Sequence, residues 1–117
     1  MIAAALVVRG YLQAADESIG YSRGLSNALF GRDVPYVLLM HIGALDAELL
    51  PELLDLYRAR GFRFVTLPEA EDDPFYLRDI DLSLAPGPDS LESVAAERGL
   101  PLPPQAPPPL AFDTICR

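Results

Sequence analysis

The sequence has no lysine and no tryptophan, and it contains only one cysteine and one histidine. With Cys116 as the single cysteine, no internal disulfide can form. One cysteine and one histidine cannot supply the four ligands of a tetrahedral Cys/His zinc centre. These absences exclude a disulfide-stapled fold and a Cys/His metal site built from this chain, and we expect no cofactor in it.

Positive charge is scarce as well. All nine basic residues are arginines, and they face 17 acidic residues, so the formal net charge is −8. A nucleic-acid partner requires a basic face, and an anionic membrane attracts polybasic segments. We therefore predict that neither a nucleic acid nor a membrane is a partner.

No apolar run is long enough to cross a bilayer. The run from Ile2 to Val8 is short, and no basic residue precedes it, so it makes a weak signal peptide. The sequence thus assigns no cellular location. The run resembles the middle of a longer element, and we expect that a part of the protein precedes it.

Half of the 117 residues are apolar, which is enough for the core of one small domain. Residues 2–30 carry a helical stripe that three glycines weaken, so we expect one interrupted helix or two short ones ending near Gly31. The stripe consists of Leu12, Ala15, Ile19, Leu25 and Leu29, and the glycines are Gly10, Gly20 and Gly24.

Two apolar runs have the composition of buried strands. Tyr36 to Met40 is bounded by Pro35 and Gly43, and Phe62 to Leu67 is stopped by Pro68. Between these runs we predict a helix that has an apolar stripe, with Asp46 as its N-cap and Gly61 as a left-handed C-cap. Pro51 either delays the start of this helix or lies in its first turn. The order indicates a βαβ unit, whose crossover is right-handed in ~98% of cases.

The rest of the chain changes in character. An acidic stretch extends from Glu69 to Asp81, without the ligand spacing of a calcium loop, and is predicted to be a solvated face. Residues 90–98 predict a short helix that stops at Gly99, and a proline-rich tail follows. We divide the chain into residues 1–85, an α/β portion, and residues 86–117, the short helix and tail.

A strand as apolar as residues 36–40 needs neighbours on both edges and cover on both faces. One partner strand and a few helices do not provide that. The predicted fold class is therefore α/β, a partial (β/α) barrel with one βαβ unit and flanking helices. We expect the chain to be a piece of a larger sheet or barrel, or an obligate homo-oligomer that pairs through its sheet edge.

His41 is the candidate catalytic residue, because it follows the first predicted strand directly. Ligands and catalytic groups of parallel α/β folds gather at that end of the strands, and histidine is the best acid or base near neutral pH. The alternative is that His41 only hydrogen-bonds a backbone carbonyl. Ser22 and Ser26 have no histidine near them in sequence, so a serine hydrolase triad is unsupported.

Two elements resemble the end of the polysaccharide deacetylase family, also called the NodB-homology or carbohydrate esterase 4 family. Leu39-Met40-His41 matches its Leu-x-His strand, and Arg58 to Leu67 matches its Arg/Lys-x-x-Gly-Tyr/Phe-x-Phe-Val-x-Leu segment. The resemblance implies a distorted (β/α) barrel that removes N- or O-acetyl groups from polysaccharides with a divalent metal such as zinc. It implies that His41 protonates the leaving sugar group and that Leu39 holds the acetyl methyl.

The family's other motifs are missing: Thr-Phe-Asp-Asp, His-x-x-x-His, Arg-x-Pro and Asp-x-x-Asp-Trp do not occur. We therefore expect the C-terminal fragment of a metal-dependent polysaccharide deacetylase, from a truncated gene, a misplaced start codon or a split reading frame, that is inactive alone. Its substrate would be a polysaccharide bound by the longer parent. The alternative is a small non-catalytic α/β interaction module that dimerises through its sheet edge.

Overall fold

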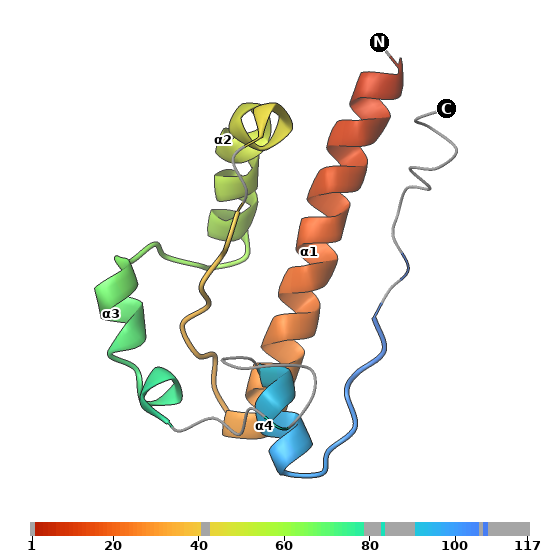
Figure 1. Ribbon diagram of the computed structural model, residues 1–117. Helices are drawn as coiled ribbons and strands as arrows, with labels where there is room; N and C mark the ends of the chain where they lie inside the picture. Colours follow the sequence, from red (N-terminus) through yellow and green to blue (C-terminus); the bar gives the residue numbers. More distant parts are fainter. Residues whose placement is uncertain (1, 41–42, 79–82, 84–90, 106, 108–117) are drawn as a thin grey trace. The chain divides into compact units, whose positions relative to one another are not determined.

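The computed structural model describes residues 2–40, 43–78, 83, 91–105 and 107. These residues form four α-helices and one 3₁₀ helix (Figure 1). In chain order they are α1 (Ile2–Phe30), α2 (Ala44–Ala59), α3 (Leu67–Glu71), the 3₁₀ helix η1 (Pro74–Leu77) and α4 (Leu91–Glu97). None of the helices in the described part of the chain is long and apolar enough to cross a membrane.

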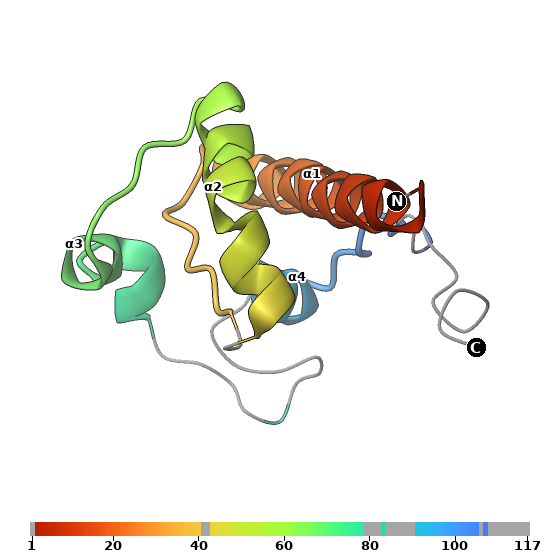
Figure 2. The same cartoon turned by 90° about the horizontal axis from the view of Figure 1, so that it is seen from above.

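The predicted fold class is wrong. The described residues contain no strand, and hence no sheet, βαβ unit or partial barrel. Residues 36–40 and 62–66, which precede and follow α2 in the chain, have no strand assignment, and neither view draws an arrow in the described part (Figures 1 and 2). The physical reason is that β-branched and aromatic composition favours an extended backbone, whereas a strand also needs a hydrogen-bonded neighbour.

The first helix is continuous rather than interrupted. Gly20 and Gly24 lie inside α1, where a Cβ at either position would meet no atom within 4 Å. The two glycines therefore destabilise the helix only through the backbone entropy that they lose on folding. Packing of the long apolar stripe offsets that loss. The helix ends as predicted at Gly31, whose φ of 66° lies in the left-handed region and whose N–H bonds to the Asn27 carbonyl at 2.9 Å.

The second helix starts before its predicted cap. Its N-cap is Gly43, which forms no side-chain cap bond, and Asp46 lies in the first turn instead. There the carboxylate still faces the positive end of the helix. Pro51 falls inside the helix, contrary to the prediction that it would delay the start or occupy the first turn. The predicted left-handed end is confirmed, because Gly61 has a φ of 86°.

A short helix replaces the end of the second predicted strand. Thr66 is the N-cap of α3 and forms a capping box with Glu69: Glu69 Oε2 accepts from Thr66 N at 2.8 Å, and Glu69 N donates to Thr66 Oγ1 at 3.4 Å. Pro68 lies in the first turn, where its missing N–H costs nothing. Leu67 therefore begins a helix, and Pro68 does not end a strand.

The chain divides into two compact units. The first contains the described residues of Met1–Ile19, Leu39–Arg63 and Gln105–Arg117. It buries Ile19, Leu49 and Leu53, and Tyr57 packs edge-on against Phe62 with ring centroids 5.3 Å apart. Leu49 and Leu53 belong to the apolar stripe that the sequence predicts for this helix.

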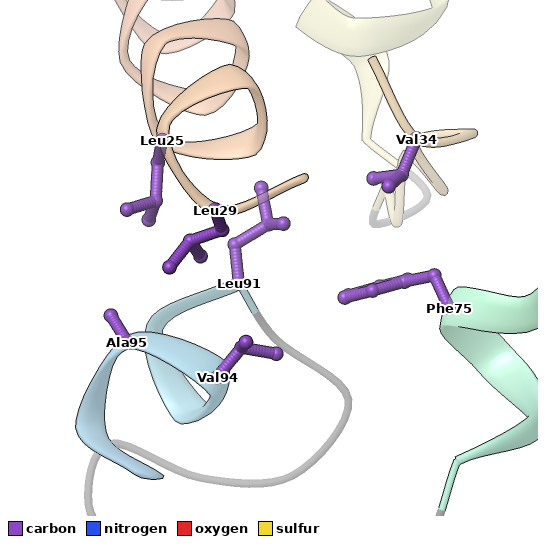
Figure 3. Packing of buried hydrophobic residues seen from close by; sticks show 7 residues of the cluster. All are labelled: Leu25, Leu29, Val34, Phe75, Leu91, Val94 and Ala95. Carbon is purple, nitrogen blue, oxygen red and sulfur yellow. The ribbon is translucent and has the colours of Figure 1, made fainter. Parts of the chain in front are cut away.

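The second unit contains the described residues of Gly20–Leu38 and Phe64–Pro104. Its core combines side chains from the end of α1, from η1, from α4 and from the segment after α1 (Figure 3). The members are Leu25, Leu29, Val34, Phe75, Leu91, Val94 and Ala95. The predicted domain boundary at residues 85 and 86 lies outside the described residues.

Candidate functional site

The candidate catalytic residue, His41, lies outside the described residues, so its role stays a prediction. Leu39, the candidate substrate-binding residue, ends the described part of the extended segment that leads to it. Its side chain is 85% exposed, the highest value among the large apolar side chains of the described part. In this chain Leu39 is thus directed to solvent.

No group of three or more histidine, cysteine, aspartate and glutamate side chains that could hold a metal ion occurs in the described residues. The donor set that those residues offer consists of carboxylates, and several of these are committed to arginine or to a helix cap.

Ser26 is the only described polar side chain with 0% exposure, and its hydroxyl is fully engaged. It donates to the Arg32 carbonyl at 2.8 Å and accepts from the Val34 N–H at 3.0 Å. The hydroxyl thereby fastens the segment after α1 to the helix. A buried hydroxyl used in this way is a structural link and not a nucleophile.

Arg32 and Asp73 form the best-defined ion pair of the second unit. Arg32 Nη1 lies 2.9 Å from Asp73 Oδ2, and Arg32 Nη2 lies 2.7 Å from Asp73 Oδ1. Asp73 Oδ1 also accepts from the N–H of Phe75 at 3.0 Å, which caps η1. The hydrogen bond from Arg32 lowers the pKa of Asp73, because it favours the charged carboxylate.

Tyr36 lies at the start of the apolar segment and is not suited to proton transfer. Its hydroxyl donates to Asp33 Oδ1 at 2.8 Å. Burial is the main cause that raises the pKa of Tyr36 to about 12. A phenol with that pKa stays protonated at neutral pH, so it cannot serve as a general base there.

Two polar contacts join α1 to α2 in the first unit. The Tyr11 hydroxyl donates to Asp46 Oδ1 at 2.9 Å, and burial of Tyr11 is the largest cause of its raised pKa. Arg60 Nε and Nη2 lie 2.6 and 2.7 Å from the two oxygens of Asp16. The hydrogen bond from Arg60 lowers the pKa of Asp16. Both contacts link the start of α1 to the two ends of α2.

The sequence reasoning missed most of these polar contacts. The capping box Thr66-x-x-Glu69 has a recognisable spacing and could have been found. The partnership of Arg32 with Asp73 has no local signal, because the two residues are far apart in the chain. The acidic stretch predicts a solvated face that includes Asp73, whereas the structure shows Asp73 bonded to Arg32 and to the start of η1.

The chemically distinctive surface of the described part is an uncharged, extended segment. Val37, Leu38 and Leu39 are 49%, 52% and 85% exposed. Within the described part of the chain, no backbone–backbone hydrogen bond involves these three residues. Exposed apolar side chains on an extended backbone are a feature that an unpaired strand would also show.

Comparisons with known proteins found no relative of this chain. No family model matches it, and no curated protein and no solved structure shows a significant match.

Proposed function

We propose that this chain is the C-terminal part of a metal-dependent polysaccharide deacetylase, which hydrolyses acetyl groups from amino sugars or sugar hydroxyls. One observation carries the proposal. Leu39-Met40-His41 is followed, at the spacing of the family, by the segment from Arg58 to Leu67. The activity requires a further polypeptide that supplies the metal site.

The local structure of the matched segments supports the need for such a polypeptide. Leu39 and residues 62–66 belong to no helix or strand, and large apolar side chains among them are exposed to water: Leu39 is 85% exposed, Phe64 49% and Val65 40%. Leaving large apolar side chains in water forgoes about 1.5–3 kcal/mol for each one that could be fully buried. A polypeptide that covers these side chains gains that free energy.

Within the completed enzyme, His41 donates a proton to the oxygen or nitrogen of the departing sugar. Leu39 contacts the methyl of the acetyl group. The completing polypeptide would hold the metal, which would supply Lewis-acid activation of the attacking water. The contribution of this chain is therefore a proton donor and an apolar contact.

The chain alone is expected to be inactive. Purified 117-residue protein, incubated with an acetylated glucosamine oligomer and added Zn²⁺, should release no acetate. Isothermal titration with Zn²⁺ alone should show no stoichiometric binding. Release of acetate by the isolated chain would overturn the division of labour proposed here.

The coding sequence around this segment provides a direct test. The proposal requires codons for an Asp-Asp pair and a His-x-x-x-His motif in an adjoining or co-expressed polypeptide. In an enzyme assembled from both parts, His41→Ala should lower kcat by roughly 10²–10⁴-fold. Gln13→Ala, a change at an exposed α1 side chain that bonds to Glu17 one turn along the helix, is the control and should leave kcat unchanged.

Two results would contradict the proposal. One is the absence of both metal motifs from every polypeptide that copurifies with the chain. The other is an assembled enzyme whose turnover and pH profile do not respond to His41→Ala. The competing function is a small non-catalytic interaction module, to which the same exposed apolar side chains would also be suited.

A further inference from the structure

Residues 100–104, with the sequence Leu-Pro-Leu-Pro-Pro, form a proline segment that follows α4. Each of the five residues is a proline, precedes a proline, or does both. A proline ring holds φ at about −65°, and the residue before a proline is driven to the extended region. The sequence therefore holds the whole segment close to polyproline II. This local restriction depends neither on the deacetylase proposal nor on the first unit.

The end of α4 fixes where the proline segment starts. Gly99 has a φ of 65°, and its N–H donates to the Ala96 carbonyl at 3.0 Å. The N–H of Leu100 donates to the Ala95 carbonyl at 2.8 Å. These are the two bonds of a Schellman motif. Because Ala95 belongs to the core of the second unit, the segment leaves a packed helix in a defined direction.

The unit to which the proline segment belongs leaves it open to water. Both leucines are 46% exposed, Pro101 and Pro104 are exposed as well, and Pro103 is partly buried. Polyproline II has three residues per turn, so residues three apart lie on the same face. Pro101 and Pro104 therefore form a ridge of two exposed rings.

The backbone of the proline segment decides the kind of partner. Pro101, Pro103 and Pro104 have no N–H, so the segment cannot continue a helix or pair as an inner strand of a sheet. A partner must recognise the proline rings and the free carbonyls, as grooves lined by aromatic side chains do. Binding there orders little chain, because the bound conformation exists beforehand.

Charge narrows the choice of partner further. No charged residue occurs from Gly99 to Phe112. The preceding residue, Arg98, is engaged within its own unit: its Nη1 donates to the Leu29 carbonyl, and its guanidinium carbon lies 5.1 Å from the centroid of the Phe30 ring. The segment thus offers no basic anchor to a groove that depends on an acidic pocket. The lack of positive charge also opposes a nucleic acid or an anionic membrane.

We propose that the proline segment is a docking site for a second protein, a domain that reads polyproline II through an aromatic groove without an acidic pocket, as WW domains do. Pro101 and Pro104 enter the groove, and its aromatic rings pack against them. The Schellman motif at Gly99 presents the segment from the second unit. This interaction is separate from the catalytic role proposed for His41.

Tryptophan fluorescence provides the test, because the chain contains no tryptophan and the signal comes from the partner domain alone. The full chain is titrated into each of a panel of purified WW domains, whose grooves contain a tryptophan. We expect a saturable change with at least one of them. An SH3 domain with an acidic pocket should bind at least roughly tenfold more weakly, since Arg98 is engaged.

A pair of proline variants locates the contact. The double variant Pro101→Ala and Pro104→Ala should raise the Kd roughly tenfold or more, because it removes both rings of the ridge and frees the backbone. Pro51→Ala is the matched control: it removes an exposed proline from α2 and should leave the Kd unchanged.

Three results would overturn the proposal. The first is a panel in which no domain gives a saturable change. The second is a double variant that binds no more weakly than Pro51→Ala. The third is tighter binding to the SH3 domain than to every WW domain. Circular dichroism of each variant checks that its helices are intact, which is expected because Pro101 and Pro104 lie outside the helices and the core.

Discussion

Arg32 and Asp73 meet through two parallel hydrogen bonds, with Nη1–Oδ2 and Nη2–Oδ1 distances of 2.9 and 2.7 Å. This bidentate geometry makes the ion pair directional, because both hydrogen bonds require a fixed orientation of the guanidinium and the carboxylate. Asp73 has a second task, because the same carboxylate caps η1 through the N–H of Phe75. The pair thus connects the segment after α1 to the short helix whose phenylalanine enters the core of the second unit.

Asp73→Ala is expected to destabilise the chain by about 1–2 kcal/mol, because it removes both a helix cap and an ion pair. The measurement is the free energy of unfolding from urea titration, followed by far-UV circular dichroism. Asp72→Ala is the neighbouring control, since this exposed carboxylate has no side-chain bond in the described part of the chain. A control that costs as much as Asp73→Ala would contradict the assigned role.

Stability should fall in acid through the same carboxylate. Its folded pKa is lowered by Arg32, so the stabilisation is fully present above the unfolded aspartate value of ~3.9. It is lost as the pH falls below that value and through the folded pKa. Asp16, lowered by Arg60, acts in the same direction. Thermal melts between pH 7 and pH 3 should show the loss, and Asp73→Asn should flatten part of the slope.

The Ser26 hydroxyl supplies a prediction with an internal control on the same helix. Ser26→Ala leaves the Arg32 carbonyl and the buried Val34 N–H without their partner, at a cost of about 1–3 kcal/mol. Ser22→Ala, one turn earlier on α1, removes a hydroxyl that is only partly buried, and it should change stability by less than about 0.5 kcal/mol. Equal costs at the two positions would show that Ser26 is not a specific link.

Much of the helical part could be predicted because its signals are local. Gly31, Gly61 and Gly99 follow helices in the structure, and all three have positive φ values, as their positions in the sequence indicate. The short helix predicted over 90–98 occurs as α4, from Leu91 to Glu97. A helix satisfies its own backbone, so its pattern does not depend on distant residues.

The prediction of strands was wrong because a strand, unlike a helix, depends on residues far away in the chain. An extended segment becomes a strand only when a neighbour pairs with it, and the apolar pattern of residues 36–40 specifies the backbone and not the neighbour. The ion pair of Asp73 with Arg32 could not be predicted for a similar reason, because no local sequence pattern indicates it. Phe75 was overlooked inside an acidic stretch, although it is a core residue with 7% exposure. As for the candidate site, Leu39 is placed in solvent and His41 keeps its predicted role untested.

Two glycines should respond to alanine with opposite signs. Neither position is crowded, since a Cβ at Gly24 or at Gly31 would meet no atom within 4 Å. Gly24 lies within α1, so Gly24→Ala should stabilise the chain by about 0.5–1 kcal/mol through reduced backbone entropy. Gly31 has a φ of 66°, where a Cβ approaches the following carbonyl, and Gly31→Ala should cost about 1–2 kcal/mol. Thermal denaturation of the two variants decides the sign for each. Because open space is common to both positions, a difference between them can only come from backbone conformation, and two stabilising results would mean that α1 does not end in the left-handed turn at Gly31.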